Sequence, residues 1–101
     1  MTRTMEEIVR EQARLITLKA LAGQVDETLN SDLLMYELQA FGINKPREWL
    51  HEQLKWLQTL DAITLRQAGS LLVAKLAARG AEHLNYTIAI EGIQRPSRPG
   101  G

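Results

Sequence analysis

The sequence contains no cysteine, only three prolines and few aromatic residues, which make up 5% of its 101 residues. The absence of cysteine excludes disulfide bonds, thiolate nucleophiles and cysteine-ligated zinc, and it fits a reducing compartment, so we expect a cytoplasmic protein. Long apolar runs are missing as well. The polar start Met1–Glu7 has no such run behind it, so we expect neither a signal peptide nor a membrane-spanning helix.

An excess of charge of one sign is also absent, because 12 Lys and Arg balance 12 Asp and Glu. A dedicated DNA-binding protein usually carries a basic excess. The charges are unevenly distributed, however: acidic residues outnumber basic ones over residues 1–43, and basic residues outnumber acidic ones over residues 63–101. Positive potential therefore gathers toward the C-terminal part, where contacts to phosphate are most favourable.

The spacing of hydrophobic residues predicts a mainly helical domain over residues 1–93. With 45% hydrophobic residues, the chain can build one continuous core. Amphipathic helices are predicted over residues 4–22, 31–41, 47–60 and 76–85. Thr4 and Glu7 have the spacing of a capping box, and Gly23 is placed to end the first helix in a left-handed turn.

A short extended segment is predicted at Gln24–Leu29, between the first two helices. Either Asn30 or Ser31 can cap the second helix, because both side chains accept hydrogen bonds from free backbone donors. Phe41 has the spacing to face the core at the end of this helix. The two helices that follow the extended segment are joined tightly, which predicts a helix-turn-helix.

The third helix and the segment after it have clear boundary residues. Asn44 is the candidate cap of the third helix, and Pro46 lies in its first turn, where the missing donor costs nothing. Two short apolar runs, 62–65 and 71–74, then predict a β-hairpin, with Gly69 free to take a left-handed turn position.

The C-terminal end of the chain gives weaker patterns. Thr87–Ile90 fits either a strand or an apolar extension packed on the body, and the strand is the favoured interpretation. Residues 94–101 contain two of the three prolines and no large apolar side chain. We therefore expect a disordered tail over 94–101.

Three helices followed by a hairpin and a further helix is the order of a winged helix-turn-helix. Leu54–Ile63 resembles the passage in which the third helix of a winged-helix protein runs into the first wing strand. Leu76–Leu84 resembles the passage from the second wing strand into the last helix, although Ala77 stands where a capping Ser or Thr is common. The expected fold is therefore mainly α with a small β-hairpin, of the winged helix-turn-helix class.

The chain is also similar to small winged-helix proteins encoded in Mu-like phages and prophages. The residues that carry this resemblance are Ile8–Glu11 with Arg14 and Leu15, Leu29 with Asn30, Leu54–Leu57, Ala78–Ala81 and Glu91–Pro96. The resemblance implies the fold and a phage context, and with it the cytoplasm of the host cell. It implies no activity that can be carried over residue by residue, so function has to be argued from the sites themselves.

The candidate DNA-binding residues are polar or basic and lie around the third helix and the hairpin. They are Lys45, Arg47, His51, Lys55 and Gln58 on or beside the helix, and Arg66 and Lys75 on the hairpin, with Arg95 and Arg98 in a tail that could reach a groove. Glu48 and Glu52 oppose this hypothesis because phosphate repels them, although a glutamate can accept from a cytosine amino group. An ordinary solvated helix of mixed charge explains the same residues equally well.

Trp49 and Trp56 lie on one side of the third helix, offset from its leucine stripe. They have three possible uses. They can widen the core, form a partner or dimer interface, or, in the case of Trp49, face DNA. The sequence does not separate these uses, so both residues are candidate partner-binding residues.

No catalytic, metal or cofactor site is predicted. His51 and His83 are the only histidines, and we expect both at the surface without a metal ion. No serine has the setting of a nucleophile, and no glycine cluster could cradle a phosphate. We therefore do not expect an enzyme.

Two classes of function remain. One is a sequence-specific protein that binds double-stranded DNA as a homodimer and acts as a phage transcriptional regulator or DNA-handling factor. The other is a protein-interaction module in phage assembly that uses the Trp49 and Trp56 face. Salt separates the two, because only the first should bind DNA with an affinity that falls steeply as salt rises.

Overall fold

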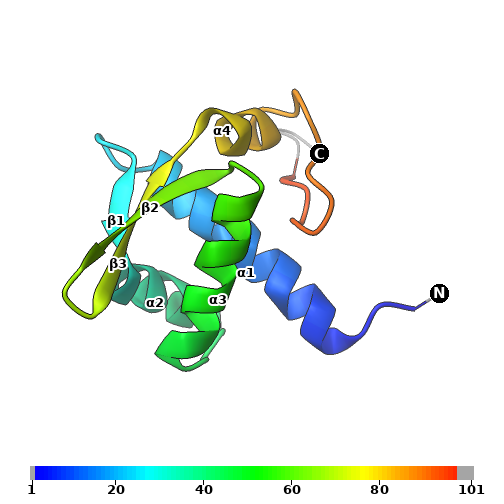
Figure 1. The fold of residues 1–101 in the computed structure, drawn as a ribbon. Helices are drawn as coiled ribbons and strands as arrows, with labels where there is room; N and C mark the ends of the chain where they lie inside the picture. The colour runs from blue at the N-terminus through cyan, green and yellow to red at the C-terminus, as the bar shows by residue number, and fades with distance from the viewer. Residues whose placement is uncertain (1, 98–101) are drawn as a thin grey trace.

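Helices pack around one face of a small antiparallel sheet in the computed structural model, which describes residues 2–97 (Figure 1). In chain order the elements are α1 (Met5–Ala22), β1 (Thr28–Asn30), α2 (Ser31–Ala40), α3 (Arg47–Thr59), β2 (Ile63–Ala68), β3 (Leu71–Leu76) and α4 (Ala78–Leu84). The prediction of a mainly helical chain with a small hairpin is confirmed. No helix within residues 2–97 is long and apolar enough to cross a membrane.

The sheet has three strands in the order β1-β3-β2. The extended segment expected before the second helix forms β1, which pairs with β3 and so adds a third strand to the predicted hairpin. The hairpin is also longer than predicted. Its strands pair as far as Ala68 opposite Leu71, which leaves a two-residue turn at Gly69, where φ is +62°. Arg66, Gln67 and Ala68, which follow the first predicted apolar run, therefore belong to β2.

Strand register decides which side chains face the helices. Ala74 is paired with Leu29 on one side and with Leu65 on the other, and Ala74 is fully buried. Lys75 is exposed and is paired with Thr28 and Thr64. Side chains alternate between the two faces along a strand. Ala74, Leu29 and Leu65 therefore line the core face of the sheet. The outer face is lined by Lys75, Thr28 and Thr64.

The core is built from leucines at helical spacing. The fully buried ones are Leu18 and Leu21 of α1, Leu34 of α2, and Leu50, Leu54 and Leu57 of α3. Phe41 is not part of this core, and its predicted core position is wrong, since 59% of it is exposed. The reason is that α2 ends at Ala40, so Phe41 caps the helix and departs from its periodicity.

Two of the predicted helix caps are confirmed. Thr4 Oγ1 accepts from the Glu7 amide at 3.1 Å as part of a full capping box, and Asn30 Oδ1 accepts from the Leu33 amide at 2.9 Å. Ser31, the other candidate cap of α2, has a different role. Its buried hydroxyl accepts from the Leu72 amide at 3.1 Å and joins α2 to β3.

Two other boundary predictions are wrong. Gly23 ends α1 with φ of −78°, in the right-handed region, because its amide still donates to the Lys19 carbonyl. Asn44 does not cap α3. The cap position is occupied by Pro46, whose side chain cannot accept a hydrogen bond. The first turn of α3 therefore has no side-chain cap.

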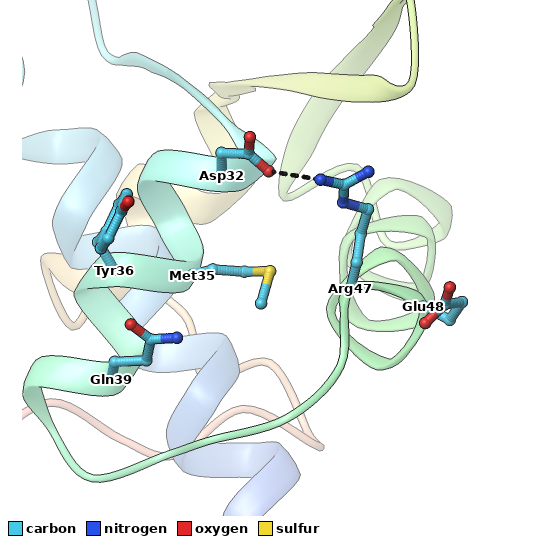
Figure 2. Close-up of a pocket in the computed structure, with 6 residues that line it drawn as sticks. All are labelled: Asp32, Met35, Tyr36, Gln39, Arg47 and Glu48. Atoms are coloured by element: carbon cyan, nitrogen blue, oxygen red, sulfur yellow. Dashed lines mark hydrogen bonds and ion pairs between the residues drawn. The ribbon is translucent and has the colours of Figure 1, made fainter.

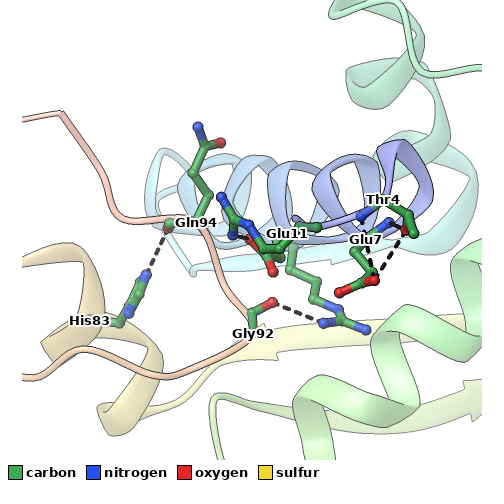
Figure 3. A network of polar contacts seen from close by, with 8 residues as sticks. Thr4, Glu7, Glu11, His83, Gly92 and Gln94 are labelled. Atoms are coloured by element: carbon green, nitrogen blue, oxygen red, sulfur yellow. Dashed lines mark hydrogen bonds and ion pairs between the residues drawn. The ribbon is translucent and has the colours of Figure 1, made fainter. Parts of the chain in front are cut away.

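Residues 85–97, the described part of the chain after α4, contain no strand, so the favoured interpretation of Thr87–Ile90 is wrong. Its backbone is bound by a side chain in place of a neighbouring strand: the Ile90 amide donates to His83 Nδ1 at 3.0 Å. His83 Nε2 lies 3.0 Å from the Gln94 carbonyl oxygen (Figure 3). The Gln94 amide donates to the Glu11 carbonyl at 3.1 Å.

The predicted tail thus begins at a residue whose backbone is bound to the body on two sides. The rest of the predicted tail divides at residue 97. Residues 94–97 are described, whereas Arg98 and the residues after it lie outside the described part of the chain.

Candidate functional site

The exposed side of α3 carries most of the predicted DNA-binding residues. Arg47, His51 and Lys55 follow one another at four-residue intervals, so they share a side of the helix. Arg47, Lys55 and Gln58 are exposed, and His51 is partly buried. Lys45 lies just before the helix, with its ammonium 5.7 Å from the centre of the Trp49 ring.

A groove separates the start of α3 from α2 (Figure 2). Its volume is about 410 Å³, and its lining includes Met35, Tyr36 and Gln39. Arg47 reaches across the groove to Asp32, with 3.3 Å between Nη2 and Oδ1, while Met35 points into the space between the helices. The charge of Arg47 is therefore partly neutralised, although about half of each side chain in this pair remains exposed.

His51 is less suited to contact phosphate than its position on the helix suggests. Its Nε2 is buried without a hydrogen-bond partner in the described residues. Burial lowers the pKa of His51, and the positive charges of Arg47 and Lys55 lower it further, whereas Glu48 and Asp32 act in the opposite direction. The neutral imidazole is therefore favoured more than it is in an ordinary exposed histidine.

Acidic residues share the exposed side of α3. Glu48 and Glu52 are both exposed, and they follow Arg47 and His51 in sequence. Their carboxylates reduce the positive potential that Lys45, Arg47 and Lys55 create. The helix surface is of mixed charge, as the sequence predicted.

Arg66 and Lys75 occupy a second place, on the outer face of the sheet. They border a hollow of about 360 Å³ with Thr28, Thr64 and Asp26. Neither cation forms an ion pair within residues 2–97. Since α3 packs against the core side of β2, the seven predicted residues form two groups, one on α3 and one on the outer sheet face.

Trp49 and Trp56 are both partly buried and packed against the hydrophobic core. Trp56 also has a partner that the sequence did not indicate. The guanidinium of Arg14 lies 3.6 Å from the centre of its ring.

Arg14 itself is buried, with 9% of its surface exposed. Its Nε donates to Gln53 Oε1 at 3.0 Å. Its Nη1 donates to the carbonyl of Gly92, which Figure 3 labels, at 2.8 Å. Burial lowers its pKa, as does the nearby Arg10, while Glu11 raises it. The cation joins α1, α3 and the C-terminal segment, which is a structural role.

His83 is also internal. It is 1% exposed, so its predicted surface position is wrong, and both of its ring nitrogens are used to hold the C-terminal segment. Within residues 2–97, no group of three or more His, Cys, Asp or Glu side chains is arranged to hold a metal ion.

No protein-family model matches the chain. One relative is the protein named uncharacterized protein gp26 of Escherichia phage Mu, which is 27% identical over 92 residues. This match covers 91% of the present chain and 95% of the phage protein. The similarity supports a Mu-like phage origin. The name of the relative states no activity, so none can be transferred from it.

Proposed function

We propose that this chain is a winged-helix protein of a Mu-like phage that binds duplex DNA through α3 and the β2–β3 hairpin. The observation that carries the proposal is the order of the elements: α1, β1, α2, α3, then β2 and β3 in a sheet of order β1-β3-β2. In a winged helix-turn-helix with this order, α3 is the recognition helix and the hairpin is the wing.

The turn between α2 and α3 supports the same assignment. The Ile43 amide donates to the Leu38 carbonyl at 2.9 Å, and the Ile43 side chain is buried. Gly42, with φ of +82°, allows the chain to reverse directly after α2. The angle between the two helices is therefore fixed, which a recognition helix needs if it is to be held in a groove.

The number of available cations limits how strongly DNA can be bound. Five positive side chains are available on the two groups: Lys45, Arg47, Lys55, Arg66 and Lys75. If all five contact phosphate, the logarithm of the binding constant falls with the logarithm of the salt concentration with a slope of about −4.5. Glu48 and Glu52 weaken the attraction further, so we propose weak general binding and a role in phage transcription regulation or DNA handling that depends on a preferred sequence.

The direct test is fluorescence anisotropy of a labelled, mixed-sequence duplex at a series of salt concentrations. We expect salt-dependent binding by the unmodified protein, weakened in Lys55→Gln and in Arg66→Gln. Each substitution should reduce the salt slope by about 1, because each removes one phosphate contact. Arg10→Gln is the matched control, since it removes the same charge from α1, outside the proposed face.

Two results would overturn this proposal. One is the absence of binding at the lowest salt concentration. The other is an equal loss of affinity in Arg10→Gln and in the two face variants, because binding would then follow net charge rather than the proposed surface.

One observation favours the alternative function, a protein-interaction module in phage assembly. Tyr36 is 71% exposed on α2, beside the groove that leads to α3, and Leu33 is also exposed on the same helix. Exposed apolar and aromatic residues are typical of protein contacts. This function becomes the preferred one if the DNA experiment gives no salt-dependent binding.

A further inference from the structure

Arg47 is held differently from the other cations of the proposed DNA-binding surface. It is the first residue of α3, and its Nη2 lies 3.3 Å from Oδ1 of Asp32, in the first turn of α2. Figure 2 shows the two side chains meeting across the gap between these helix starts. Within residues 2–97, none of the other four proposed cations forms an ion pair. In this part of the chain, Arg47 is therefore the only one of the five that a carboxylate holds in place.

This ion pair matters for geometry more than for stability. The side chain of Arg47 is 44% exposed and that of Asp32 is 46% exposed. A pair so accessible to water contributes little to the free energy of folding. It does restrict the guanidinium, which would otherwise move freely at the end of a long side chain. The pair therefore keeps the guanidinium at the start of α3, beside the gap that leads to α2.

The charge beside Arg47 does not favour a phosphate at this place. The Asp32 carboxylate already contacts the guanidinium. A phosphate brought to Arg47 would come close to this carboxylate, which repels it. A neutral group with hydrogen-bond acceptors is not repelled in this way. The environment of Arg47 thus favours the edge of a base over the DNA backbone.

The donors that Arg47 still has to offer match one base. A guanidinium carries five N–H donors and no acceptor, and Asp32 is its only side-chain hydrogen-bond partner within residues 2–97. In the major groove, guanine presents two acceptors, N7 and O6, whereas adenine presents one acceptor and one donor. A side chain that can only donate therefore pairs with guanine through two hydrogen bonds.

We propose that Arg47 reads a guanine in the major groove and that Asp32 is the positioning residue that orients its guanidinium. This inference rests on the proposed function, because it requires α3 to enter the groove. The first residues of a recognition helix are the ones that contact base edges, and Arg47 occupies that position in α3. The other four cations then contact phosphate, so the expected salt slope is about −3.6.

Selection from a pool of duplexes with a randomised central segment, followed by sequencing, tests the guanine contact. We expect the unmodified protein to enrich guanine at one position of its preferred sequence at least about fivefold over each other base. Arg47→Ala should lose this preference while it keeps the rest of the preferred sequence and the salt slope. Lys55→Ala is the matched control. It should keep the full preferred sequence, bind every duplex more weakly and reduce the salt slope by about 1.

Asp32→Ala tests the positioning role through two readouts that move in opposite directions. The affinity for a mixed-sequence duplex should rise, because the substitution removes a negative charge from the proposed surface. The guanine preference should fall by about two- to fivefold, the effect expected of one exposed ion pair, and Asp32→Glu should restore part of it. Glu37→Ala is the control, since it removes the same charge from α2 beside the hollow that α1 lines. It should leave the guanine preference unchanged.

Three results would overturn the proposal, and they can be told apart. If no duplex is enriched and none is bound at low salt, the proposed function fails and the guanine contact fails with it. If duplexes are enriched but Arg47→Ala selects the same sequence, DNA binding stands and Arg47 is not a base contact. If Asp32→Ala keeps the full guanine preference, Asp32 does not position Arg47. Far-UV circular dichroism verifies that each variant is folded.

Discussion

The central guanidinium carbon of Arg14 lies over the ring of Trp56, 3.6 Å from the ring centre. The cation has no carboxylate partner among the described residues, and its polar partners are the neutral oxygens of Gln53 and Gly92. The aromatic face and these two acceptors therefore replace the water that Arg14 loses on burial.

Arg14→Lys should lower the free energy of unfolding by about 1–2 kcal/mol, because an ammonium cannot keep both hydrogen bonds together with the contact to the Trp56 ring. Urea denaturation measures the change. Arg10→Lys is the control, and since Arg10 is only partly buried we expect its effect to stay within about 0.5 kcal/mol. Equal effects of the two substitutions would show that the contact with the Trp56 ring adds nothing.

Two glycines should respond in opposite directions to replacement by alanine. A Cβ on Gly80 would lie 2.3 Å from the Ala62 carbonyl oxygen, so Gly80→Ala should destabilise the protein by about 3 kcal/mol. A Cβ on Gly23 meets nothing closer than 3.5 Å, and its φ suits any residue. Gly23→Ala should therefore raise stability by about 0.4–1 kcal/mol. Thermal unfolding of both variants tests this, and a destabilised Gly23→Ala would contradict the right-handed end of α1.

His51 should make stability depend on pH. Its pKa in the folded protein is lowered by burial and by Arg47 and Lys55, against Glu48 and Asp32, whereas in the unfolded chain it is about 6.5. The unfolded chain therefore binds more protons as the pH falls below about 6.5, and the free energy of unfolding decreases until the pH passes the folded pKa. Above about pH 6.5 the contribution is complete.

The measurement is the difference in stability between the unmodified protein and His51→Gln across this range. We expect the difference to change with pH below about 6.5 and to be constant above it. A constant difference throughout would mean that the folded pKa of His51 is not lowered.

His83 should exist as a single tautomer in the folded protein. Its Nδ1 accepts from the Ile90 amide, so the proton of the neutral ring is on Nε2, which then donates to the Gln94 carbonyl. Long-range proton–nitrogen correlation spectra distinguish the two nitrogens. A proton found on Nδ1 would contradict the observed packing of the C-terminal segment against α4.

Local features of this fold were predictable from sequence. The capping box of Thr4 and Glu7, the Asn30 cap and the leucine stripes depend on residues within a turn or two of each other, where spacing alone decides the geometry. The hairpin turn at Gly69 belongs to the same class, since it needs only a residue that tolerates a positive φ.

Contacts between residues far apart in the sequence were not predictable from such local spacing. Arg14 is 39 residues from Gln53 and 78 residues from Gly92, and no local pattern connects them. The third strand, β1, is only three residues long and is recognisable only through its pairing with β3. His83 was expected at the surface for a similar reason, because its two bonding partners come from a segment without regular structure.

In the candidate site, too, the features set by local spacing were predictable and those set by strand pairing were not. The grouping of Arg47 and Lys55 on α3 follows from helical spacing, and the structure brings them to one side. Arg66 and Lys75 were predicted on the hairpin, but their place on its outer face depends on strand register, which the pairing of Thr64 with Lys75 sets.

An amide NMR titration with mixed-sequence duplex DNA, at low salt and again at higher salt, tests the central claim most directly. The proposed function predicts shifts confined to residues 45–58 and 66–75 that fade as salt rises, because these segments hold the available cations of α3 and the hairpin. A spectrum unchanged by DNA at low salt would contradict it.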